Sequence, residues 1–122
     1  MTVIRIEHPK QGWGIFLNAS LIDGDYHDSD WFSRHQDMDC ASVIKGFKYG
    51  IHFCAYKSIE EMERWLTIDE IALFISKGFE VLQLEVTDYI VETDQVLFTK
   101  ESITDRKNLN TLFLQKSLEV QV

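Results

Sequence analysis

The sequence has few basic residues, a single proline and no stretch typical of a linker between domains. Pro9 is the single proline, and no stretch rich in glycine and serine marks a linker. Lys and Arg number 12 against 20 Asp and Glu, which gives a formal net charge of -8. Because nucleic-acid phosphates attract basic surfaces, this charge argues against direct contact with nucleic acid. It suits either a soluble acidic domain, which is favoured on charge alone, or a protein that docks on a basic surface of another protein.

Membrane, metal and cofactor signatures are also lacking. No apolar run reaches the length of a membrane span and the N-terminus has no apolar signal-peptide core, so we expect a cytoplasmic protein that does not contact a membrane. The two cysteines, Cys40 and Cys54, form no C-x-x-C motif, so zinc and dithiol motifs are absent. Cys54 lies in an apolar segment and is expected to be a buried free thiol. The sequence contains no P-loop, GxGxxG, G-x-S-x-G or H-E-x-x-H motif, and we expect no cofactor and no metal.

Hydrophobic residues make up 45% of the chain and aromatic residues 12%, which favours a folded domain over disorder. The length suits one domain with one core over residues 1–122. Its fold class is predicted to be α+β, with a mixed or antiparallel sheet of about five or six strands and two helices inserted in the middle of the chain. The strands are expected at residues 2–7, 49–56, 79–86, 89–92 and 95–99.

Both predicted helices begin at capping boxes. Ser58 and Glu61 precede a helix over 59–66, and Thr67 and Glu70 begin a second helix that ends before Gly78. On the first strand, Ile4 and Ile6 share the side that is expected to face the core. The tail beyond Lys100 is left open between a short helix at 105–115 and a final strand.

Residues 18–48 are predicted to form a long irregular excursion rich in aspartate. Carboxylates also suit calcium or magnesium, but the order of an EF-hand is missing and an acidic contact surface is favoured. Exposed aromatic residues among carboxylates are typical of a protein-binding face. The candidate partner-binding residues are Trp13, Asp23, Asp25, Asp28, Asp30, Trp31, Arg34, Asp37 and Asp39.

Arg5 and His52 are the candidates for chemistry. The guanidinium of Arg5, on the polar side of the first strand, suits a phosphate or carboxylate, but a surface ion pair with Glu7 or with a neighbouring strand is favoured. His52 is predicted to share a strand face with Cys54 and Tyr56. It is either an acid, base or ligand, or a partly buried histidine bonded to a neighbouring carbonyl group, and the second interpretation is favoured.

A family resemblance covers about residues 3–99. The segments RIEHP, G-x-GIF, RH followed by Asp39, GIHFCAYKSIEEMERW, GFEVLQLEV and QVLF resemble those of small phage and prophage proteins. Their order is also similar to a reduced ADP-ribosyltransferase-like pattern. That resemblance implies an NAD contact at Arg5 or His8, a second motif over residues 50–53, and a catalytic Glu on a late strand. Here His52 replaces the expected Tyr, and the late strand offers Gln95.

Two functional hypotheses follow, beside the plainer alternative of a structural domain without a ligand. In the first, a phage-type protein binds and inhibits a host protein or nucleoprotein with a basic surface, such as a defence or nucleic-acid-binding complex, through the acidic segment and its tryptophans. The resemblance implies the phage setting, and the charge suggests the basic partner. In the second, a mono-ADP-ribosyltransferase-like enzyme uses NAD with Arg5, His52 and Gln95 as the catalytic residues. The binding protein is favoured, and the sequence does not indicate an oligomeric state.

Overall fold

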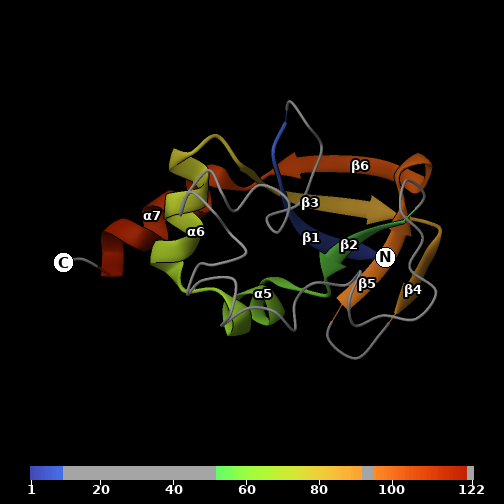
Figure 1. Cartoon of the computed structure of the whole chain (residues 1–122), viewed down its shortest axis with the longest axis horizontal. Helices are drawn as coiled ribbons and strands as arrows, with labels where there is room; N and C mark the ends of the chain where they lie inside the picture. Colours follow the sequence, from blue (N-terminus) through green and yellow to red (C-terminus); the bar gives the residue numbers. More distant parts are fainter. Residues whose placement is uncertain (10–51, 92–94, 121–122) are drawn as a thin grey trace, which may run out of the picture.

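The computed structural model describes residues 1–9, 52–91 and 95–120. In these ranges six strands form one sheet in the order β4-β5-β2-β1-β3-β6, and every neighbouring pair is antiparallel. Figure 1 shows this sheet with β6 along one edge, β4 at the other, and the helices toward one end. The α+β class and the single six-stranded sheet confirm the predicted fold.

The described elements follow the predicted order along the chain. The strands are β1 (Thr2–Glu7), β2 (His52–Tyr56), β3 (Glu80–Val86), β4 (Tyr89–Val91), β5 (Gln95–Thr99) and β6 (Ile103–Asn108). The helices are α5 (Ile59–Trp65), α6 (Ile68–Ser76) and α7 (Asn110–Val120), with a 3₁₀ turn η3 (Lys100–Ser102) before β6. The tail therefore holds both a strand and a helix, where the sequence left the two as alternatives.

One face of the sheet packs against the helices. Ile4 and Ile6 of β1 lie in a buried cluster with Met62 of α5, Phe74 of α6 and Phe113 of α7. This arrangement confirms that the isoleucine side of the first strand faces a core. Burying such apolar side chains is the dominant favourable contribution to folding.

The opposite face of the sheet is buried as well. Val3 of β1, Leu84 and Val86 of β3, and Val96 of β5 are each 0% exposed, and their cluster includes no residue of α5, α6 or α7. Successive side chains of a strand point to opposite faces, so Arg5 shares this second face with Val3. Arg5 is buried, so the expectation that an ion pair at this position lies on the surface is wrong.

The caps form with one difference between the helices. Thr67 and Glu70 make the complete reciprocal box of α6. At α5 the Ser58 hydroxyl accepts from the amide of Glu61, while the Glu61 carboxylate accepts from Arg64 at 3.0 Å. Gly78 has a φ of +97°, as expected for a left-handed residue that ends a helix.

Two further findings concern the cysteine and membrane expectations. Cys54 is disulfide-bonded, so the expectation of a free thiol there is wrong. Among residues 1–9, 52–91 and 95–120, no helix is long and apolar enough to cross a membrane.

Candidate functional site

Arg5 lies at the centre of a buried ionic cluster rather than at an open binding site. Its Nε donates to Oε1 of Glu7 at 2.9 Å and its Nη1 donates to the carbonyl oxygen of Cys54 at 2.7 Å. The guanidinium carbon lies 5.2 Å from the ring centroid of Phe53. Across the sheet, Nη1 of Arg106 on β6 lies 3.9 Å from Oε2 of Glu7. Burial lowers the pKa of Arg5, and the adjacent carboxylate of Glu7 opposes this shift.

The structure does not bring the three residues of the enzyme hypothesis together. His52 pairs with Thr99 at one end of β2, while Gln95 pairs with Tyr56 at the other end. The two positions are four residue steps apart along the strand, which is about 13 Å. His52 and Gln95 share the sheet face of Tyr56, which belongs to the cluster packed against the helices. The Arg5 side chain lies on the opposite face. His52 is half-buried and Gln95 is buried.

The sequence-based partner-binding residues cannot be placed on this sheet. Trp13, Asp23, Asp25, Asp28, Asp30, Trp31, Arg34, Asp37 and Asp39 all lie outside the described residues. Within the described ranges, no three His, Cys, Asp or Glu side chains gather as metal ligands.

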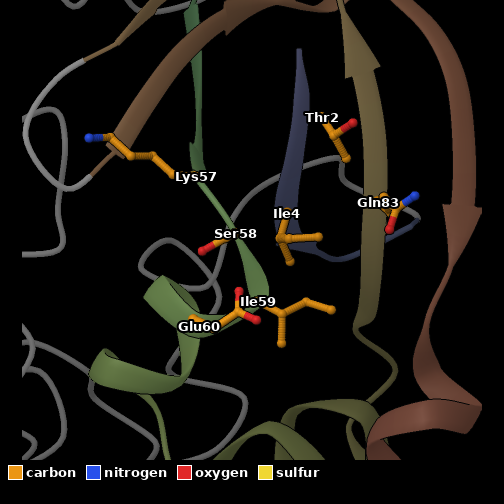
Figure 2. A pocket seen from close by; sticks show the side chains of 7 residues that line it. All are labelled: Thr2, Ile4, Lys57, Ser58, Ile59, Glu60 and Gln83. Carbon is orange, nitrogen blue, oxygen red and sulfur yellow. The ribbon is translucent and has the colours of Figure 1, made fainter.

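A shallow groove lies where β2 leads into α5. It has a volume of about 250 Å³, and its lining includes Thr2 and Ile4 of β1 and Gln83 of β3. Figure 2 shows Ile4 near Ile59 and Glu60, with Thr2 and Gln83 farther along their strands, while Lys57 extends away from them. The volume is below the roughly 300–1,000 Å³ of small-molecule sites. Its hydroxyl groups have protein partners, since Ser58 caps α5 and Thr2 donates to Glu85.

The two edges of the sheet differ sharply in chemistry. The β6 edge is polar, with exposed Asp105, Arg106 and Lys107, and an Asp105 carboxylate oxygen accepts from the Arg106 amide at 2.9 Å. Charged side chains of this kind protect an edge strand from pairing with other chains. The β4 edge instead carries three consecutive large apolar residues: Tyr89 is 43% exposed, and Ile90 and Val91 are each 49% exposed.

The hydrogen-bond register fixes which backbone groups of β4 point outward. The Thr99 amide donates to the Asp88 carbonyl group at 3.2 Å, so residues 88 and 99 form a hydrogen-bonded pair. Such pairs alternate along an antiparallel ladder. Ile90 therefore bonds to Leu97, and the N–H and C=O groups of Tyr89 and Val91 point away from β5.

The sequence predicted a strand here but did not single out its edge position. The available signal was three adjacent apolar residues, Tyr89 to Val91, bounded by Asp88 and Glu92. A strand with one solvated face normally alternates apolar and polar residues. Three apolar residues in a row with carboxylates at both ends depart from that pattern.

The fold and this edge together define a small α+β domain with one polar and one apolar sheet edge. A family model described as Bacteriophage T4 Y00F protein matches residues 1–111. The chain therefore belongs to this bacteriophage protein family, as the resemblance to phage proteins implied. Searches among curated proteins and among solved structures give no match.

Proposed function

We propose that this phage protein binds and inhibits a host protein that carries a basic surface. The observation that carries the proposal is the apolar β4 edge, where Tyr89, Ile90 and Val91 are each nearly half exposed. Contiguous exposed apolar residues rimmed by polar groups are typical of protein-interaction sites. Tyrosine is also among the residues enriched in such interfaces.

The charge of the chain supports a basic partner. The formal net charge is -8, and carboxylates bound the edge in the sequence at Asp88, Glu92 and Asp94. Complementary charge accelerates encounter and selects partners, while the apolar centre supplies affinity. The acidic segment 23–39 with Trp31 remains part of the proposal as a second contact with the same partner.

The test is affinity capture from a bacterial host lysate with the full chain, followed by mass spectrometry. The wild type is compared with Ile90→Lys, which puts a charge in the apolar edge. Leu118→Lys is the matched control, because Leu118 on α7 is an even more exposed apolar residue, at 64%. We expect a partner that is recovered by the wild type and by Leu118→Lys but not by Ile90→Lys.

The proposal also specifies salt dependence and biochemical effect. Binding should weaken as NaCl rises from about 0.05 M to about 0.5 M, because salt screens exposed charges. Changing Asp23, Asp25, Asp28 and Asp30 to Asn should weaken it further. The purified partner should lose its own activity when bound. Equal recovery by all variants, or no reproducible partner at low salt, would contradict the proposal.

A further inference from the structure

We infer that β4 binds its partner by strand addition, in which an extended segment of another protein extends the sheet beyond β4. This inference rests on the proposed function and specifies the chemistry of the partner. The outward N–H and C=O groups of Tyr89 and Val91 supply two donors and two acceptors at the spacing of a ladder. An exposed edge with such groups is a template for strand pairing, and several peptide-binding domains use it.

The side chains add specificity to these backbone bonds. Tyr89 and Val91 share a face with Phe98 and Val96 of β5, to which they are paired, and Ile90 shares the other face with Leu97. An added strand would therefore place alternate side chains beside Tyr89 and Val91 on one face and beside Ile90 on the other. Apolar and β-branched residues suit these cross-strand contacts.

Charge selects a different protein over a second copy of this chain. Two copies of this chain would each bring a formal net charge of -8 to the pairing, and like charges repel. The exposed carboxylate of Asp88 directly precedes β4 at this edge. Lysine or arginine on the incoming strand would meet this carboxylate instead. The occupant is therefore an extended segment with an apolar centre and basic ends.

The probe is a terminally blocked peptide with alternating Val and Thr in its centre and two Lys at each end, KKVTVTVKK. Hydrogen exchange followed by NMR should show slower exchange of the Tyr89 and Val91 amides when the peptide is bound. The Ile90 amide, already bonded to β5, should change little. A peptide with Glu in place of Lys should bind roughly tenfold more weakly at low salt.

Val91→Pro is the decisive variant. Proline removes the outward N–H of Val91 but none of the bonds between β4 and β5, and an edge strand tolerates proline at such a position. Val91→Thr is the matched control because it keeps the N–H group and a β-branched side chain. We expect Val91→Pro to weaken peptide binding roughly tenfold, through one lost bond and the steric block of the ring, and Val91→Thr to change it little. Unchanged thermal unfolding would verify that both variants are folded.

Strand addition by a partner would be overturned by unaltered exchange at Tyr89 and Val91 with the peptide at millimolar concentration, or by equal binding of Val91→Pro and Val91→Thr. It would also be overturned by a concentration-dependent dimer that already protects both amides, because a second copy would then be the occupant. A host partner lost with Ile90→Lys but retained with Val91→Pro would overturn strand addition and leave host-protein binding standing. Peptide binding as expected, with no host protein recovered, would contradict the proposed function alone.

Discussion

The substitution Glu7→Gln tests whether Arg5 is stabilised as a buried ion pair. Arg5 is 6% exposed and the Glu7 side chain 13% exposed, so both charges are largely removed from water. Gln keeps an oxygen that can accept from Arg5 Nε but removes the negative charge that faces two guanidinium groups, those of Arg5 and Arg106. The buried positive charge then loses electrostatic compensation, which is costly at low dielectric.

The expected loss follows from this burial. Removing one partner of a fully buried pair costs roughly 3–5 kcal/mol. Because Glu7 retains some exposure and Gln retains the acceptor, we expect a loss of about 2–3 kcal/mol in the free energy of unfolding. Globular proteins unfold with an entropy of about 2.1 cal/mol/K per residue, so 122 residues give about 0.26 kcal/mol/K. The Tm should therefore fall by roughly 8–12 °C in thermal unfolding followed by circular dichroism.

Glu63→Gln provides the control. Glu63 on α5 accepts from Lys116 on α7 at 2.8 Å, but the two side chains are 33% and 35% exposed. Such solvated pairs contribute at most about 1 kcal/mol, so Tm should fall by no more than about 4 °C. Equal losses in the two variants would refute the argument that burial determines the strength of the Arg5–Glu7 pair.

Three further predictions concern the pH range, the helix stop and the caps. Burial raises the pKa of Tyr56 above its ordinary value of 10, with a smaller opposing effect of Arg5, so the unfolded chain ionises first and stability should fall as pH rises above about 10. Tyr56→Phe should flatten that fall in urea unfolding measured at successive pH values. Gly78→Ala should cost roughly 1–2 kcal/mol because φ is +97°, whereas the added Cβ would make only an ordinary van der Waals contact with His8 Nε2 at 3.5 Å. An unchanged Tm would contradict this. Thr67→Ala should cost about 1 kcal/mol and more than Ser58→Ala, because only α6 has the complete box. The reverse order in thermal unfolding would contradict it.

The parts of the fold with strong local signals could be predicted from the sequence. Alternation in TVIRIE gave the strand Thr2–Glu7, and the spacing of Thr67 and Glu70 gave the start of α6. Gly78 marked the end of that helix because glycine, which has no Cβ, adopts the left-handed backbone conformation needed there without steric cost. These signals depend on neighbours within a few residues, which sequence inspection can see.

The burial of Arg5 could not be predicted in the same way. Arg5 and Glu7 alternate with Ile4 and Ile6, which is the pattern of a strand with one solvated face. In the sheet order β1 lies between β2 and β3, and both of its faces are buried. The partners that make burial tolerable include the Cys54 carbonyl group, 49 residues away in the sequence. Such long-range compensation has no local signal.

The C-terminal tail shows a second limit. The strand Ile103–Asn108 is an edge strand whose residues beyond Ile103 are exposed, so no alternation marks it. The next helix is positioned by a tertiary contact, since the Asn110 side chain accepts from the Val81 amide at 2.7 Å and donates to the Phe79 carbonyl group at 3.3 Å. The sequence therefore offered a helix or a strand, whereas the chain forms one after the other.

The edge position of β4 allows its binding role to be separated from stability. Ile90 and Val91 leave nearly half of their surface in water, so substitution there removes little buried apolar area. The neighbouring strand β5 remains paired with β2 through five residue pairs, and Val96 and Phe98 remain in the second-face cluster. A variant such as Ile90→Lys should therefore fold with a near-normal Tm. A loss of partner binding in that variant would then report on the edge itself and not on unfolding.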